Sequence, residues 1–433
     1  MPHDGKYTVV SSDCHGGASM EEYRDYLDSS YRDEFDQWVA SYEVPYDDLK
    51  GEEGGRNWDS DRRVREMESD GVVAEVMFPN TIPPFFPTSS LASSQAAVTD
   101  TAEFNRRWAG LRAHNRWLVD FCASSGGRRA GVFQILLHDI DEAVKEVQWA
   151  VGAGLRGGLL LPGVPPGSGL PPIYYHEHYA PLWALCAEQG IPVNCHSGSS
   201  GPRMGDRPED DLFFLLEMKW WDQRTLRHFI LGGVLERHPS LQVVLTEVGV
   251  SWIPAELRAM DAICKSMRNE QDEQAVNYHG PQALGARALL PSEYWRRQCF
   301  AGASFIHPAE VAMSKSVGVD RIMWGSDYPH NESSFPYSRE AIAFSFAGVS
   351  PADTEQMLGG NAVRLYGFSA ERLGAIGSLA GPGRQDTFDG IDPVTLPAEA
   401  AKCPAFAGAM AGCGTVQMDD NKKARASQPA QAQ

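Results

Sequence analysis

The chain has 433 residues, of which 42% are hydrophobic and 22% are charged, a composition typical of a globular protein with a large buried core. The formal net charge of −19, with no offsetting cluster of Lys and Arg, argues against nucleic acid as a partner. There is no run of about eighteen apolar residues and no leader-like amino terminus, so we expect a cytoplasmic protein with no membrane contact.

Eight short apolar or β-branched runs recur along the chain, and each stops at a polar or glycine-containing tip. In order they are KYTVVSSDCH, GVVAEVMFPN, RRAGVFQILLHD, LRGGLLLPG, IPVNCHSG, LQVVLTEVG, QCFAGASF and RIMWGSDYPH. Segments with helical spacing lie between most of them, for example residues 61–70, 141–154 and 179–190. Strands and helices that alternate in this number predict an α/β fold, a (β/α)₈ TIM barrel with its active site at the carboxyl ends of the strands.

Three segments depart from this alternation. We expect the barrel to span residues 1–378, with a lid or insertion over its mouth at residues 17–70, because that connection is too long for an ordinary βα loop. A second overhanging stretch follows the fifth strand, and a helix is expected to resume near Arg224. Periodicity is lost over residues 379–433, which predicts a C-terminal surface wrap followed by a disordered tail.

The first strand ends in SSDCHGG, which places Asp13 and His15 two positions apart. Because successive side chains of a strand face opposite sides, these two share one face and Cys14 turns away from them. Two polar groups on one face of an apolar strand must meet water or a partner such as a metal ion.

The tips of three later strands add further donors. The fifth strand supplies His196, the sixth supplies Glu247 and the eighth supplies Asp327. Each of these residues also has an ordinary structural explanation. His196 could hydrogen-bond a loop carbonyl, Glu247 could pair with an arginine, and Asp327 could cap the helix after its strand. A barrel brings its strand ends together around one mouth, so we expect a functional cluster instead. Imidazoles and carboxylates together suit one divalent metal, with Zn²⁺ expected and Mn²⁺ or Fe²⁺ as alternatives.

The motifs SSDCHGG, NCHSG, ERHPSLQVVLTEVGVSWIP, RIMWGSDYPH and GGNAVRLYGF resemble the amidohydrolase superfamily. The likeness is to the branch that contains aminocarboxymuconate-semialdehyde decarboxylase and the nonoxidative aromatic acid decarboxylases, and it covers roughly residues 7–370. The resemblance implies a small-molecule substrate, a homodimer, and a single divalent metal held by Asp13, His15, His196 and Asp327.

Two residues depart from the pattern of that branch. Many relatives begin with His-x-His or Glu-x-His, whereas this chain has the carboxylate of Asp13. The decarboxylases typically present an acid/base histidine on the sixth strand, whereas Glu247 stands there in this chain.

The motifs leave several activities open. In a decarboxylase, the metal would chelate the substrate carboxylate and a neighbouring hydroxyl or amino group while Asp327 or Glu247 protonates the ring carbon. In a hydrolase of an amide or lactone, Asp327 would take a proton from metal-activated water, with Glu247 as a second acid/base. Two further alternatives remain open: the protein could hydrate a double bond, or it could be a non-catalytic barrel that binds a metal or a ligand. The resemblance favours decarboxylation of a small carboxylated, possibly aromatic, substrate.

Other residues near the predicted mouth are candidates for substrate contact. His330 follows the eighth-strand aspartate by three positions, and Trp252 follows the sixth strand, where it could form a pocket wall. Arg56, in the first insertion, is a candidate partner for a substrate carboxylate because a guanidinium matches that group bidentately.

Overall fold

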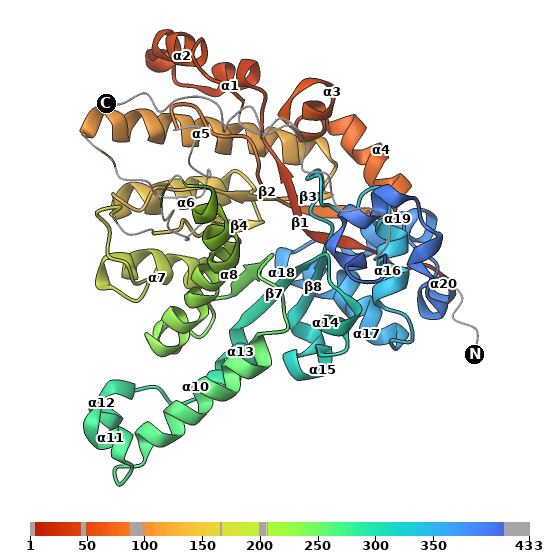
Figure 1. The fold of residues 1–433 in the computed structure, drawn as a ribbon. Helices are drawn as coiled ribbons and strands as arrows, with labels where there is room; N and C mark the ends of the chain where they lie inside the picture. Colours follow the sequence, from red (N-terminus) through yellow and green to blue (C-terminus); the bar gives the residue numbers. More distant parts are fainter. Residues whose placement is uncertain are drawn as a thin grey trace.

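A ring of eight parallel strands forms the centre of the molecule in the computed structural model, which describes residues 5–44, 49–86, 98, 100–164, 167–198, 205 and 207–410. Each strand pairs with the next in chain order (Figure 1). The strands are β1 (Val10–Gly16), β2 (Ala74–Pro79), β3 (Arg129–Phe133), β4 (Gly158–Leu160), β5 (Val193–His196), β6 (Val243–Thr246), β7 (Cys299–Ser304) and β8 (Ile322–Gly325). Seven lie within the runs that the sequence predicts to be strands, and β1 extends one residue beyond its run, to Gly16.

The ring closes where β1 meets the segment that follows β8. Cys14 and Tyr328 form a parallel bridge, and the His15 amide donates to the Tyr328 carbonyl at 2.7 Å. The Asp327 amide donates to the Asp13 carbonyl at 2.8 Å. The predicted TIM barrel is therefore confirmed, and the backbone of two predicted ligand segments forms the seam.

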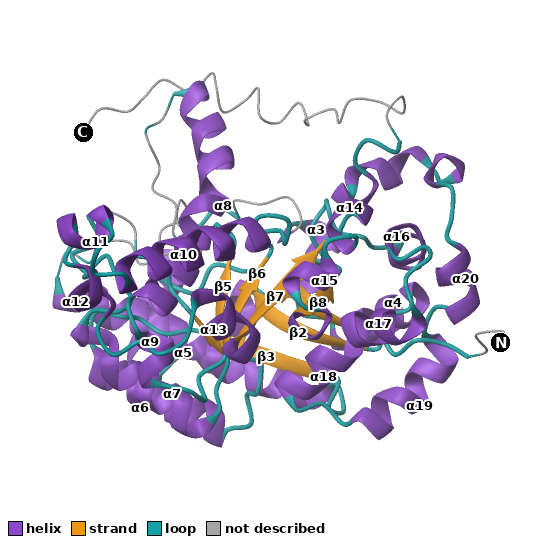
Figure 2. Cartoon of the chain, turned by 90° about the horizontal axis from the view of Figure 1, so that it is seen from below, coloured by secondary structure: helices purple, strands orange, loops and turns teal. Residues whose placement is uncertain are grey.

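Helices surround the strands on the outside (Figure 2). They are α1 (Met20–Tyr26), α2 (Arg32–Val39), α3 (Gly51–Gly54), α4 (Ser60–Asp70), α5 (Thr101–Ser124), α6 (Ile140–Gly152), α7 (Ala180–Gln189), α8 (Pro208–Leu231), α9 (Val234–Arg237), α10 (Ile253–Arg268), α11 (Glu273–Asn277), α12 (Gly280–Leu284), α13 (Pro291–Gln298), α14 (Pro308–Val311), α15 (Ser314–Val317), α16 (Ser338–Ser345), α17 (Pro351–Glu355), α18 (Asn361–Tyr366), α19 (Ala370–Ala380) and α20 (Arg384–Asp389). Among the described residues, no helix has the length and apolarity needed to cross a bilayer.

Alternation along the strands produces two apolar layers. Val76 and Phe78 of β2 and Val132 of β3 belong to a cluster that fills the barrel interior. Met77 and Phe133, their neighbours in the chain, belong to the larger cluster between strands and helices. Because alternate side chains of a strand face the barrel interior and the surrounding helices, the position of a polar residue at the strand end decides which of the two sides it faces.

The predicted insertion at residues 17–70 divides into two parts. Its last helix, α4, is the barrel helix that precedes β2, and it ends at Gly71, whose φ of 92° gives the left-handed C-terminal cap that glycine favours. The preceding part carries α1 to α3 and is anchored through Tyr23, whose hydroxyl lies 2.6 Å from Thr81 Oγ1 and 2.8 Å from His114 Nδ1. Its role as a lid stays a prediction.

The helix after β5 differs from the sequence prediction. We expected it to resume near Arg224, but α8 begins at Pro208. Proline is well suited to the first turn of a helix, where its missing N–H costs nothing. Most of the large apolar residues in this helix's first half are exposed, so the periodicity that normally reports burial against the chain's own core does not mark where the helix begins.

The C-terminal segment packs on the barrel as a series of short turns and helices. After α20, Ala400, Cys403 and Phe406 are buried in a small cluster with Ala341 of α16. Residues 411–433, which include the expected disordered tail, lie outside the described residues. The boundary that we placed at residue 378 falls within α19, and the division of the chain into two units stays a prediction.

Candidate active site

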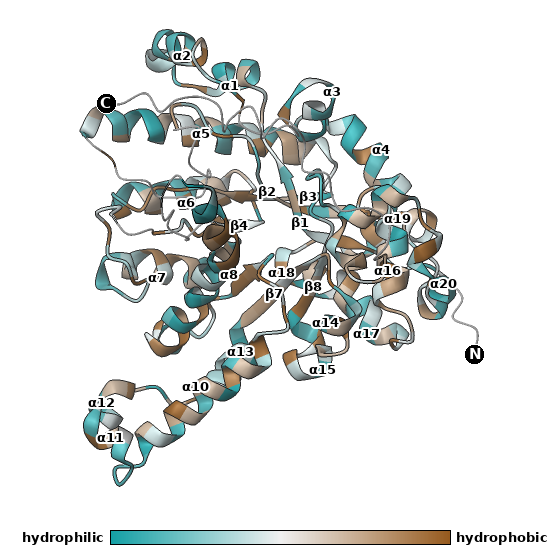
Figure 3. Ribbon diagram, viewed as in Figure 1, coloured by the Kyte–Doolittle hydropathy of each residue, from teal (hydrophilic) through white to brown (hydrophobic). Residues whose placement is uncertain are grey.

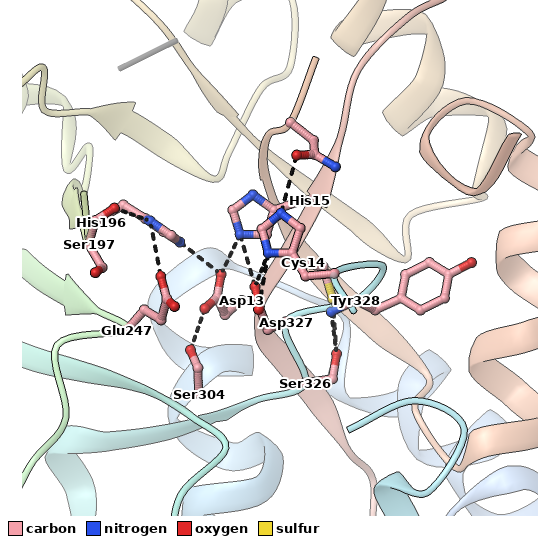
Figure 4. A network of polar contacts seen from close by, with 12 residues as sticks. Asp13, Cys14, His15, His196, Ser197, Glu247, Ser304, Ser326, Asp327 and Tyr328 are labelled. Carbon is pink, nitrogen blue, oxygen red and sulfur yellow. Dashed lines mark hydrogen bonds and ion pairs between the residues drawn. The ribbon is translucent and has the colours of Figure 1, made fainter. Parts of the chain in front are cut away.

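The carboxyl end of β1 carries the first two predicted ligands. The register of β1 against β2 shifts between Ser11 and Cys14, which places a bulge at residues 12–13. Asp13 and His15 point into the barrel mouth, whereas the Cys14 thiol lies 3.4 Å from the Ser326 hydroxyl (Figure 4). The arrangement that the sequence predicts for this strand end is thus present.

Asp13 lies at the centre of the cluster and is fully buried. Its Oδ1 is 3.3 Å from His15 Nε2 and 3.2 Å from His196 Nε2, and its Oδ2 accepts a hydrogen bond from Ser304 at the end of β7. Burial by itself would raise the pKa of Asp13, but the two histidines outweigh that effect and lower the pKa well below its usual range. Asp13 is therefore a carboxylate that joins donors from three strands.

Asp327 approaches the same point from the end of β8. Its Oδ1 is 3.1 Å from His15 Nε2 and 3.0 Å from His330 Nδ1. Burial would raise the pKa of Asp327, but the charge of His330 and the hydrogen bonds of both histidines lower it. His15 thus belongs to two groups of potential ligands, one with Asp13 and His196 and one with Asp327 and His330.

Glu247 follows β6 and lies at the edge of this cluster. Its Oε2 is 3.7 Å from His196 Nδ1, and 21% of its side chain remains exposed. Burial and the charge of Asp327 raise the pKa of Glu247 to about 7. Burial disfavours the charged form of His196, but the charge of Asp13 raises the pKa of that imidazole to about 10.

The donor atoms of the cluster fit a divalent cation. His15 Nε2 and Asp327 Oδ1 are buried and face each other at 3.1 Å, but neither atom makes a hydrogen bond of regular geometry among the described residues. In each of the two ligand groups, the potential ligand atoms all lie within 4.8 Å of one another. His15 Nδ1 is 3.2 Å from the Pro79 carbonyl, a contact that orients the ring and leaves Nε2 as the ligating nitrogen. Unpaired buried polar atoms are costly, and imidazole nitrogens and carboxylate oxygens bind Zn²⁺, Mn²⁺ and Fe²⁺.

Aromatic rings and an amide line the cluster on the β2 side. The Phe78 ring lies 4.8 Å from the His196 ring, and the His330 ring stacks on His15 at 4.1 Å. His330 Nε2 is also 3.2 Å from Asn80 Oδ1, directly after β2. His330 therefore lies at the cluster, as the sequence predicts, between a ligand candidate and this side of the mouth.

Two other predicted substrate contacts have different surroundings. Arg56 pairs with Glu66 at 3.0 Å and with Glu53. The Trp252 indole N–H donates to the Gly249 carbonyl at 2.9 Å, and the half-buried ring packs against the main core. The structure does not join either side chain to the ligand cluster, and their contacts with substrate stay predictions.

Sequence reasoning missed three polar residues that support the cluster. Ser304 and Asn80 stand at the ends of β7 and β2, so a reading of every strand tip for hydroxyls and amides could have found them. Arg63 lies inside α4 and gave no such signal. It is fully buried, and its Nη1 donates to the His15 carbonyl at 2.6 Å. This hydrogen bond holds the backbone of His15, a predicted metal ligand, in place.

Comparison with known proteins identifies related sequences and folds. The family model described as amidohydrolase matches residues 29–368 of the chain. No curated protein matches the chain.

Three solved structures illustrate the shared fold. An amidohydrolase from Mycobacterium avium subsp. paratuberculosis has a TM-score of 0.61 at 20% identity and covers 84% of this chain and 99% of its own. 5-Carboxyvanillate decarboxylase from Sphingomonas paucimobilis has a TM-score of 0.60 at 18% identity, with 83% and 99% covered. The 5-carboxyvanillate decarboxylase from Novosphingobium aromaticivorans, complexed with manganese and 4-hydroxy-3-methoxy-5-nitrobenzoic acid, has a TM-score of 0.61 at 16% identity, with 85% and 100% covered. At these identities the likeness establishes the fold.

Proposed function

The chain belongs to the amidohydrolase family, and on that premise we propose that it is a metal-dependent, nonoxidative decarboxylase of a small aromatic carboxylic acid. The observation that carries the proposal is the buried cluster of Asp13, His15, His196 and Asp327. Two of its potential ligand atoms, His15 Nε2 and Asp327 Oδ1, make no hydrogen bond of regular geometry among the described residues. Decarboxylases of ring carboxylates among the similar folds, some of them with bound manganese, support this choice of reaction.

We assign the metal ligands to Asp13, His15, His196 and Asp327. This set suits zinc, which the sequence favours, and also manganese, which is bound in the similar structure from Novosphingobium. When bound, the cation supplies positive charge that orients the substrate carboxylate and an adjacent ring hydroxyl. His330 stacks on His15 and pairs with Asp327, so it holds both ligands in place.

We assign the proton transfer to Glu247. Its side chain is partly exposed at the mouth, whereas Asp327 is fully buried and paired with two histidines. Glu247 donates its proton to the ring carbon that bears the carboxylate. The bond from that carbon to the carboxylate then breaks, its electron pair returns to the ring, and carbon dioxide leaves. Because Glu247 reaches solvent, water restores its proton for the next turnover.

Hydrolysis of a lactone or amide is the second candidate. It is favoured by Glu247 itself, which stands where the resembling decarboxylases present a histidine. In this reaction Asp327 takes a proton from water and passes it to the leaving group, and Glu247 serves as a second acid/base.

The test supplies the purified protein with Zn²⁺, Mn²⁺ or Fe²⁺ and offers two panels of compounds. One panel contains ring carboxylates with a neighbouring hydroxyl, including 2,6-dihydroxybenzoate and 5-carboxyvanillate, which similar structures are named for. The other contains simple lactones and anilides. Release of carbon dioxide from the first panel supports the proposal, and turnover of the second panel alone replaces it with hydrolysis.

Variants separate catalysis from passive binding. Asp327→Asn should abolish turnover while the protein keeps its fold by circular dichroism. Asp320→Asn is the matched control, because this aspartate precedes β8 and 57% of its side chain is exposed. If no compound reacts, and if Asp327→Asn does not change the affinity for metal, the barrel is a non-catalytic binding protein.

A further inference from the structure

The first half of α8 carries an apolar surface that no other described residue buries. Figure 2 shows this half extending away from the body of the barrel. None of residues 211–221 is buried. Of the eleven exposed large hydrophobic residues in the described part of the chain, five lie here, and Figure 3 shows brown, hydrophobic stretches beside teal, hydrophilic ones along this helix. The five exposed hydrophobic residues in this half of α8 are Leu212, Phe213, Leu215, Leu216 and Trp220, and Leu216 is the most exposed of them at 78%.

A helix of this kind is poorly stable in water by itself. The second half of α8 packs normally, with Leu226, Phe229 and Ile230 buried. The first half has no such face, and isolated helices shorter than about 12–15 residues are marginal in water. A contiguous apolar patch of this kind usually marks an interaction site. The pattern of residues in the patch therefore indicates what kind of partner could cover it.

Four of the apolar residues form one stripe. At 3.6 residues per turn, Leu212, Phe213, Leu216 and Trp220 fall within about 100° of the helix circumference. Leu216 lies midway between Leu212 and Trp220. An antiparallel copy of the same helix, centred at Leu216, would place each Leu212 opposite the other copy's Trp220 and the two Leu216 side chains against each other.

The charges along α8 are also complementary in that arrangement. Its first turn is acidic, with Glu209, Asp210 and Asp211. Arg224, toward the other end, lies over the Trp221 and Trp220 rings at 4.4 and 5.5 Å, and no acidic partner of it is seen among the described residues. In the antiparallel pair, Arg224 of one copy lies beside the acidic first turn of the other. The same acidic turn, on a chain of net charge −19, disfavours an anionic membrane as the partner.

We propose that the exposed stripe of α8 binds the α8 stripe of a second copy of this chain, in a two-fold antiparallel contact centred on Leu216. A two-fold contact is isologous, so each residue that contacts its partner is contacted in the same way in return. The proposal does not depend on which reaction the barrel catalyses.

The first experiment measures the mass of the full chain in solution by light scattering over a range of concentrations. The wild type should be a dimer, and Leu216→Glu should be a monomer with an unchanged circular dichroism spectrum. Leu379→Glu is the control, because this residue of α19 is equally exposed, at 79%, but lies outside the stripe. A monomeric wild type, or a Leu216→Glu dimer, would overturn the proposal.

The second experiment tests the register by cross-linking under mild oxidation. Leu216→Cys should give a covalent dimer, because the two copies of this residue meet on the two-fold axis. Leu212→Cys should not, because its two copies are offset by about 12 Å along the helix, beyond the reach of a disulfide. The wild type controls for the native thiols. Cross-linking of Leu212→Cys but not Leu216→Cys would reject the proposed centre. Recovery of a monomeric chain on neutral phospholipid vesicles would assign the stripe to a membrane instead.

Discussion

Replacement of Glu75 by glutamine should destabilise the protein through a buried ionic network behind the active site. Glu75 Oε2 is 2.7 Å from Arg63 Nη2, and its Oε1 is 2.8 Å from Arg129 Nε. All three side chains are fully buried. Glu75→Gln leaves two guanidinium groups buried together without a counter-charge, the situation in which a broken buried pair is most costly.

The pKa of Glu75 gives the size of the effect. Burial alone would raise this pKa, but the charges of Arg63 and Arg129 lower it from 4.5 to about 2. This difference corresponds to about 3 kcal/mol of stability at neutral pH, in the range measured for broken buried pairs. Because the pKa of the folded state is the lower one, the contribution is complete above about pH 4.5 and is lost as the pH falls toward 2.

Urea unfolding between about pH 7 and pH 3 tests both the size and the sign. At pH 7, Glu75→Gln should lower the free energy of unfolding by about 3 kcal/mol, and the difference from wild type should shrink as the pH falls below 4.5. Arg63→Met should cost less, because Glu75 and Arg129 remain as a neutral pair. Glu188→Gln, at an exposed position of α7, should change stability by less than about 0.5 kcal/mol. Parallel curves for wild type and Glu75→Gln over the whole pH range would refute the reasoning.

Three further predictions concern the site. Ser304→Ala removes the hydrogen bond that orients Asp13 and should weaken metal affinity about tenfold or more in a competition with a chromogenic chelator; unchanged affinity would show that Ser304 does not orient this ligand. Treatment with EDTA should abolish turnover and lower Tm without loss of secondary structure, and added Zn²⁺ or Mn²⁺ should restore both; full activity after complete metal removal would contradict the metal assignment. Arg56→Ala should raise KM, because the predicted role of this guanidinium is to bind a substrate carboxylate; a lowered Tm with unchanged KM would restrict Arg56 to its ion pairs with Glu53 and Glu66.

Much of the barrel was predictable because its signals are local. Each strand is a short apolar run with a polar tip, and such runs recurred in an order compatible with one topology. The same rule located Asp13, His15, His196 and Asp327, because parallel strands bring their carboxyl ends to one mouth and any polar residue at a tip must lie there.

Features that depend on distant contacts were not predictable in this way. Arg63 lies within a helical pattern in which a charged residue is ordinarily solvent-exposed, and only the fold brings it against the His15 carbonyl and Glu75. The start of α8 was missed for a related reason. Its exposed stripe does not face the chain's own core, so the periodicity that reports burial within one chain gave no clear boundary.

The backbone at two strand ends carries information that no residue pattern revealed. Glu247 and Asp327 both have φ near 61°, in the left-handed region that side chains other than glycine rarely adopt. This conformation costs on the order of 1 kcal/mol per residue, and glycine would avoid the cost. The fold accepts it at the ends of β6 and β8, where the turn brings each carboxylate to the cluster instead of continuing the strand. Because these residues are the two candidates for moving a proton, the strain is best explained by function, which requires a carboxylate where stability alone would favour glycine.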